Sequence, residues 1–200
     1  MDDSSIPLGN RLSGEVTPPC SKSYAQRALA AALLASGRTT LRGIELCRDT
    51  RSAIEAIRNL GARVTIEDDN TLIIDGGLNP TVDRLNVGES GLAARLFTPI
   101  ASLVGKPMVI DGEGTLKHRP MSMMVEPLRD LGVAVRDGGG HLENGLELAQ
   151  LTGSDHLAAA CSNQTEAGSQ FVEALLLRGL GKAVVHIGPL VVLAFGSGEQ

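Results

Sequence analysis

A recurring order of elements constrains the fold of this chain more than any other feature of its sequence. A helix start marked by Gly or Ser, an Ala- and Leu-rich helix, a Gly and a short strand follow one another three times. The helical stretches are 21–36, 88–104 and 168–180, and the strands after them are 39–44, 108–110 and 184–187. Arg27 and Gly37 map onto Arg95 and Gly105 with one common offset. Such a period indicates repeats of one supersecondary unit.

A second kind of helix follows the strand in the first two copies. It spans 49–60 and then 120–131, and each time a Gly comes next, as is typical of a helix C-cap. Two short strands then form a predicted hairpin, at 63–66 with 71–74 and at 134–136 with 146–148. We therefore expect an α/β fold built from strand, helix, strand, helix, strand, strand. The expected organisation is an N-terminal arm at 1–18 and one lobe of repeats at 19–82, 83–152 and, incomplete, 153–200.

The start of the first helix carries the most informative chemistry. Lys22 and Arg27 stand in the first turns of an otherwise apolar helix, where the helix dipole repels cations. Their presence indicates a bound anion, which the helix N-terminus and both side chains would serve together. Ser23 and Gln26 fit the S-x-x-Q capping box, which predicts a helix start near Ser23. The simplest ligand for this arrangement is a phosphate or a carboxylate.

Composition excludes several classes of function. A net charge of −5 and only 2% aromatic residues argue against a general nucleic-acid surface. No stretch reaches transmembrane length, and the first twelve residues lack the apolar core of a signal peptide. Cys20, Cys47 and Cys161 lack metal-ligand spacing, which favours free thiols in a reducing compartment. We expect a cytoplasmic protein without a metal, a nucleic-acid partner or a membrane partner.

Four motifs together resemble one family of enzymes. The motifs are 19–23 followed by Arg27, the helix start at 89–95, the loop at 112–120 that ends in Arg-Pro, and 169–171 with the apolar run behind it. In this order they are similar to the 5-enolpyruvylshikimate-3-phosphate synthases, or 3-phosphoshikimate 1-carboxyvinyltransferases, of the enolpyruvyl transferase family. The resemblance extends over nearly the whole chain and covers about the first, N-terminal half of the family's enzymes.

The resemblance implies a fold and an activity. The family has two lobes, each made of three βαβαββ units in a pseudo-threefold, inside-out barrel, with the active site in the cleft between them. The reaction moves the enolpyruvyl group of phosphoenolpyruvate onto the 5-hydroxyl of shikimate 3-phosphate, in aromatic amino acid biosynthesis. It passes through a tetrahedral intermediate, releases phosphate and needs no cofactor. This chain would be the shikimate 3-phosphate-binding half, inactive without the missing C-terminal lobe, which carries the family's proton-handling carboxylates.

Seven residues match positions at which the family contacts its two substrates. Lys22 would lie between the substrates and take a catalytic role. The residues that would hold shikimate 3-phosphate are Ser23, Arg27, Ser169 and Gln170. The residues that would meet phosphoenolpyruvate are Gly91 and Arg95.

Among the departures from the family pattern, two change the charge of the site. Thr115 stands where the family commonly carries a phosphoenolpyruvate-binding Arg, and Lys117 or Arg119 would have to compensate. Glu89 stands where an Asn is common. A further carboxylate beside an anion site is unfavourable unless it caps a helix or pairs with a cation.

Three other functions stay open on the sequence alone. UDP-N-acetylglucosamine enolpyruvyl transferase shares the repeat architecture, but it typically shows Lys-Asn at the first helix and a Cys in the loop. Here Ser23 follows Lys22, and the 112–120 loop has no Cys. A truncated, non-catalytic lobe that binds an anion is the alternative of another class. A nucleotide-binding α/β protein is least favoured, because its glycine-rich phosphate motifs are missing.

Overall fold

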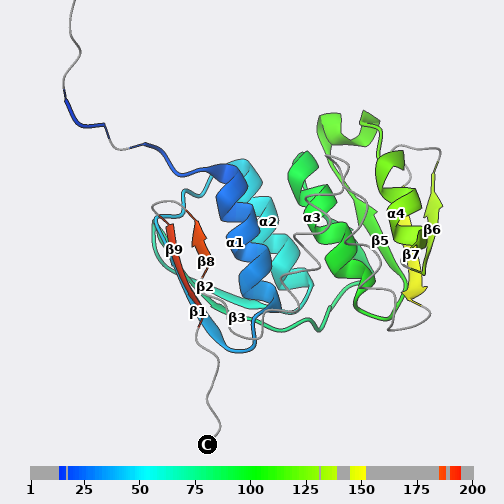
Figure 1. Cartoon of the computed structure of the whole chain (residues 1–200), viewed down its shortest axis with the longest axis horizontal. Helices are drawn as coiled ribbons and strands as arrows, with labels where there is room; N and C mark the ends of the chain where they lie inside the picture. The colour runs from blue at the N-terminus through cyan, green and yellow to red at the C-terminus, as the bar shows by residue number, and fades with distance from the viewer. Residues whose placement is uncertain are drawn as a thin grey trace, which may run out of the picture.

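Three helices lie side by side between two β-sheets (Figure 1). They are α1 (Lys22–Leu34), α2 (Arg48–Asn59) and α3 (Gly91–Ser102). The computed structural model describes residues 14–16, 18–130, 132–138, 145–151, 185–187 and 190–194. Most of the third predicted copy, including its helical stretch at 168–180, lies outside the described residues.

The first sheet has the strand order β2-β3-β1-β9-β8. Its strands are β1 (Arg38–Arg42), β2 (Arg63–Asp68), β3 (Thr71–Asp75), β8 (Val185–Ile187) and β9 (Leu190–Ala194). The predicted hairpin of β2 and β3 is confirmed. At its turn, Asp68 Oδ1 accepts a hydrogen bond of 2.8 Å from the Asn70 N–H. This bond holds the pKa of the Asp68 carboxyl below its usual range, so the turn is stabilised by an ionised side chain.

The second sheet has the order β4-β5-β7-β6. Its strands are β4 (Arg84–Asn86), β5 (Met108–Asp111), β6 (Val133–Asp137) and β7 (Leu146–Leu151). β4 and β5 are parallel and are joined through α3, whereas the other pairs are antiparallel. Two short 3₁₀ helices, η1 (Gly114–His118) and η2 (Ser122–Met124), connect β5 to α4 (Val125–Asp130).

Most predicted elements are confirmed, with differences at the second copy. No strand is predicted before the second helical stretch, 88–104, where the structure has β4. The helix expected at 120–131 was too long, since α4 begins only at Val125. Pro127 explains the shift: a proline is tolerated in the first turn of a helix, but further inside it would remove a backbone hydrogen bond.

Aliphatic packing holds the helices between the sheets. α1 buries seven of its thirteen residues, and four of the seven are alanines. Alanine lets neighbouring helices approach closely, and α1 packs on α2, α3 and the first sheet. The larger side chains that fill the core, such as Leu29, Leu33 and Phe97, are fully buried. Each such burial contributes about 1.5–3 kcal/mol. No helix in the described part of the chain is long and apolar enough to cross a membrane.

Candidate anion-binding site at three helix N-termini

The first turns of α1, α2 and α3 meet at one end of the molecule, and polar side chains connect all three. Between α1 and α2, Lys22 Nζ lies 3.3 Å from Asp49 Oδ2. Arg48 of α2 reaches the residues before α3, where its Nη1 lies 2.7 Å from Glu89 Oε2. We call the three first turns, the residues before α3 and the 112–120 loop the N-terminal edge.

The third connection joins α1 to α3 directly. The Ser90 hydroxyl donates to Gln26 Oε1 over 3.1 Å, and its oxygen accepts from the Ala93 N–H over 3.2 Å. Gln26 is only 2% exposed, and Ser90 is the N-cap of α3. The predicted capping box is therefore wrong: α1 begins at Lys22, and its N-cap is Ser21, without a side-chain bond. Gln26 is not available to cap its own helix because its amide is occupied by the start of another.

The 112–120 loop is bound to the residues that precede α3. The Glu113 N–H donates to the Gly88 carbonyl over 2.8 Å, and the Thr115 N–H donates to Glu89 Oε1 over 3.0 Å. At the far end of the loop, Arg119 approaches α3. A methyl group at Gly91 would lie 3.2 Å from Arg119 Nη1. The loop thus carries a guanidinium to the first residue of α3.

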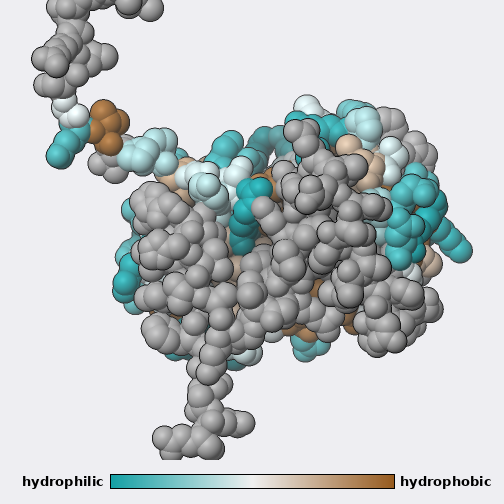
Figure 2. All heavy atoms as spheres, in the orientation of Figure 1, coloured by the Kyte–Doolittle hydropathy of each residue, from teal (hydrophilic) through white to brown (hydrophobic). Residues whose placement is uncertain are grey.

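Cations outnumber carboxylates among the side chains that the helix starts and the loop bring to this edge. The cations are Lys22, Arg27, Arg48, Arg51, Arg95, Lys117 and Arg119, and the carboxylates are Asp49, Glu89 and Glu113. Asp49 pairs with Lys22, and Glu89 pairs with Arg48. The carboxylate of Glu89 therefore meets the condition stated above for a carboxylate beside an anion site, because it is paired with a cation. The edge lies at the top of Figure 1, and hydrophilic residues gather along the same margin in Figure 2. Together with three helix dipoles, this excess of positive charge favours an anion.

Two arginines stand in the second turns of their helices. Arg27 Nη1 donates to the Ser23 carbonyl over 3.2 Å, so it lies over the start of α1. The Nε of Arg95 is buried and has no hydrogen-bond partner among the described residues. A buried donor without a partner calls for an explanation, and a bound anion is one.

The predicted site residues fall into two groups. Those on α1, on α3 and in the loop are brought to the N-terminal edge. Ser169 and Gln170 lie outside the described residues. Sequence reasoning missed the roles of Gln26 and Arg48, because their partners are distant in the chain and nothing local marks them.

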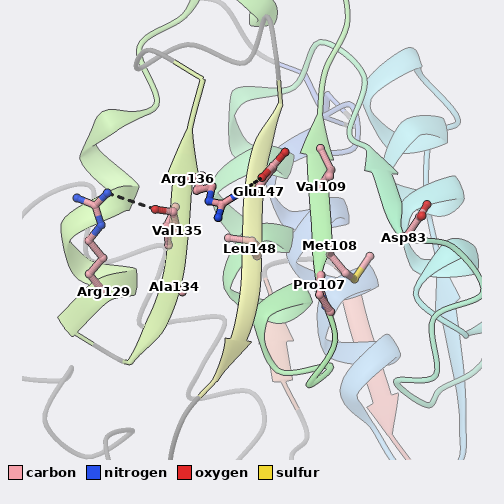
Figure 3. A pocket seen from close by; sticks show the side chains of 10 residues that line it. All are labelled: Asp83, Pro107, Met108, Val109, Arg129, Ala134, Val135, Arg136, Glu147 and Leu148. Atoms are coloured by element: carbon pink, nitrogen blue, oxygen red, sulfur yellow. Dashed lines mark hydrogen bonds and ion pairs between the residues drawn. The ribbon is translucent and has the colours of Figure 1, made fainter.

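A hollow elsewhere on the molecule is not this site (Figure 3). Its lining includes Asp83, Pro107 and Met108, which lie where the parallel strands β4 and β5 begin. The N-terminal edge lies where these strands end. A volume of about 720 Å³ would hold a small ligand. However, Arg136 pairs with Glu147 over 3.9 Å in this hollow, and no described feature of it indicates a particular ligand.

Comparison with known proteins identifies close relatives in sequence. A family model described as EPSP synthase (3-phosphoshikimate 1-carboxyvinyltransferase) matches residues 6–185. A 3-phosphoshikimate 1-carboxyvinyltransferase from Rhizobium leguminosarum bv. trifolii is 36% identical over 180 residues, covering 88% of this chain and 41% of the relative. One from Thermococcus kodakarensis is 36% identical over 166 residues, covering 83% of this chain and 38% of the relative. The chain therefore spans less than half the length of these relatives.

Solved structures show the same fold. An EPSP synthase from Acinetobacter baumannii superimposes with a TM-score of 0.68 at 22% sequence identity. The match covers 93% of this chain and 47% of that one.

Proposed function

The chain belongs to the EPSP synthase (3-phosphoshikimate 1-carboxyvinyltransferase) family, and on that premise we propose that it forms the substrate-gripping part of such an enzyme. The proposed reaction transfers the enolpyruvyl group of phosphoenolpyruvate to the 5-hydroxyl of shikimate 3-phosphate, in the cytoplasm. The observation that carries the proposal is the meeting of three helix N-termini with an excess of cations at one edge. Both substrates are anions, and this edge is built for anions.

The start of α1 takes the shikimate 3-phosphate. Ser23 is exposed in its first turn, and Arg27 lies over the same turn through its bond to the Ser23 carbonyl. A phosphate there would accept hydrogen bonds from backbone N–H groups, a hydroxyl and a guanidinium. By their match to the family motif, Ser169 and Gln170 are proposed to contact the same substrate.

The start of α3 takes the phosphoenolpyruvate. Gly91 leaves space beside the Arg119 guanidinium. One turn further along is the Nε of Arg95, which has no hydrogen-bond partner in the described part of the chain. Of the two loop cations that could replace the Arg missing at Thr115, the geometry favours Arg119. Lys22 stands between the two subsites. It is 63% exposed, so its ammonium group is accessible to a ligand although it pairs with Asp49.

The arrangement would promote the reaction chiefly by bringing two anions together. Cations and helix dipoles offset the repulsion between the two phosphates, and holding the reactants in place removes much of the entropic barrier. Proton transfer needs groups within hydrogen-bond reach of the reacting atoms. We assign those groups to the part of the enzyme that this chain does not span, and expect no turnover by this chain alone.

The proposed organisation is a lobe of βαβαββ repeats at 19–82, 83–152 and 153–200, after an arm at 1–18. Two observations support it. The elements from β4 to β7 follow this order, and those from α1 to β3 follow it without the first strand. In both sheets the hairpin pairs with the strand after the first helix, as β2-β3-β1 and as β6-β7-β5.

Titration and turnover test the proposal. We expect calorimetry to show binding of shikimate 3-phosphate to this chain, and an Arg27→Ala variant to weaken it about tenfold or more. Phosphate release from the two substrates should occur only when the remaining part of the Rhizobium leguminosarum relative is added. Phosphate release by the chain alone would refute the assignment. An Arg27→Ala variant that binds shikimate 3-phosphate with unchanged affinity would refute it as well. The family match also favours this branch over UDP-N-acetylglucosamine enolpyruvyl transferase.

A further inference from the structure

Glu89 binds two separate elements with its two carboxylate oxygens. Oε2 pairs with Arg48 of α2 at 2.7 Å, and Oε1 accepts from the Thr115 N–H of the loop at 3.0 Å. The residue itself stands directly before Ser90, the N-cap of α3. One side chain therefore connects α2, the start of α3 and the loop.

The loop is shaped to receive this carboxylate. Gly114 has φ +49°, and a Cβ there would overlap Glu89 Oε1. Glycine is favoured here because the backbone conformation is left-handed, and a larger residue would also displace the Glu89 carboxylate. A second attachment lies next to it, where Asn86 Nδ2 donates to Glu113 Oε1 over 2.9 Å.

The attachment at Thr115 determines the position of Arg119. The Leu116 N–H donates to the Glu113 carbonyl over 3.0 Å, and the Arg119 N–H donates to the Leu116 carbonyl over 3.1 Å. Leu116 is fully buried. These short-range bonds leave few torsions free between Thr115 and Arg119, so fixing one end of η1 fixes the other.

We propose that Glu89 is a positioning residue that fastens the loop so that Arg119 lies over Gly91, ready for the anion bound at α3. This inference rests on the proposed function for the identity of that anion, phosphoenolpyruvate. Arg48 makes the device compatible with an anion site, because it offsets the charge that Glu89 would otherwise set against the ligand. The charge-assisted bond to Thr115 holds the loop without making the edge negative.

Amide hydrogen exchange of the isotopically labelled chain tests the attachment directly. We expect Glu89→Ala to raise the exchange rate of the Thr115 N–H at least tenfold. Glu89→Gln should raise it less, since the amide oxygen can still accept. Glu126→Ala removes an exposed carboxylate on α4 and should leave the Thr115 rate unchanged.

Ligand titrations on the same samples test the positioning. Glu89→Ala should raise the dissociation constant for phosphoenolpyruvate about five- to tenfold, Glu89→Gln should raise it less, and neither should change binding of shikimate 3-phosphate. Circular dichroism spectra matching that of the original chain would show that the variants fold.

The possible failures can be told apart. An unchanged Thr115 exchange rate in Glu89→Ala overturns the attachment, whatever the ligands do. Faster exchange with unchanged phosphoenolpyruvate affinity overturns the positioning role. If the original chain bound neither substrate, the proposed function would fail, while the exchange data together with a titration by inorganic phosphate would still decide the role of Glu89.

Discussion

Gly91 is the residue of the N-terminal edge that lies against the Arg119 guanidinium. It opens α3, and the Arg119 guanidinium occupies the space over it. A contact of 3.2 Å between a new methyl group and Nη1 is closer than carbon and nitrogen atoms normally approach, so the guanidinium would have to move. Any ligand that needs both the α3 N-terminus and Arg119 depends on this glycine.

The first prediction is that Gly91→Ala weakens phosphoenolpyruvate binding several-fold without destabilising the protein. The methyl group displaces Arg119, whereas alanine is a better helix residue than glycine, so the unfolding free energy should stay equal or rise. Calorimetric titration and urea unfolding measure the two effects. Gly105→Ala, beyond the C-terminal end of α3, serves as the binding control; it should lower the unfolding free energy, because Gly105 has φ +74°, and leave the affinity unchanged. Unchanged affinity in Gly91→Ala would remove Arg119 from the subsite.

At the scale of elements, a buried hydrogen bond adds to the packing of α1 on α3. The Ser90 hydroxyl donates a hydrogen bond to Gln26 and accepts one from the Ala93 N–H. Neither Ser90 nor Gln26 has access to much water, so a lost partner is not replaced easily. This pair of side chains therefore contributes to the relative position of the two proposed substrate subsites.

The second prediction concerns this pair. Ser90→Ala should lower the unfolding free energy by about 1–3 kcal/mol, because it removes an N-cap and leaves the Gln26 amide oxygen unsatisfied. Gln26→Leu should also destabilise, and the double variant should cost less than the sum of the two, since both partners are then gone. Urea unfolding gives the three values, with the exposed Ser36→Ala expected within about 0.5 kcal/mol of the original chain. Strict additivity would mean that the two side chains do not interact.

The third prediction concerns the first sheet and pH. Arg38 and Asp75 face each other on β1 and β3, with hydrogen bonds of 2.8 and 3.1 Å between guanidinium and carboxylate. The bond from Arg38 lowers the pKa of Asp75 in the folded protein. A lowered folded pKa contributes stability that is fully present above the unfolded value, about 3.9, and is lost as the pH falls through the folded one.

The melting temperatures of the original chain and of Asp75→Asn should therefore differ most above about pH 5 and converge toward pH 2–3. The difference should be small at any pH because the pair is largely exposed. A difference that persists unchanged at pH 2 would assign the effect to the amide substitution itself.

At the scale of the whole molecule, the sequence predicted the helices and strands better than it predicted which of them contact one another. Periodicity and glycine positions indicated α1 to α3, the β2–β3 hairpin and the second sheet's hairpin, because these depend on local patterns. β4 was not predicted, because a three-residue strand is too short to show an alternating pattern. The helix predicted at 120–131 was too long, because Pro127 is tolerated only in the first turn of a helix. Lys22, Arg27, Gly91 and Arg95 were singled out from motifs and from cations at helix starts. Only the fold shows the hydrogen-bond and ion-pair partners of Gln26, Arg48 and Glu89.

By itself, the sequence determined an α/β chain with cations at its helix starts, because helix signals act within a few residues. The tertiary structure alone decided that three of those starts meet at one edge and that Glu89 is paired with a cation. It also decided that the Arg119 guanidinium lies beside Gly91 at the start of α3. These outcomes depend on contacts between residues tens of positions apart, and such contacts arise only when aliphatic burial brings the two sheets and their helices together.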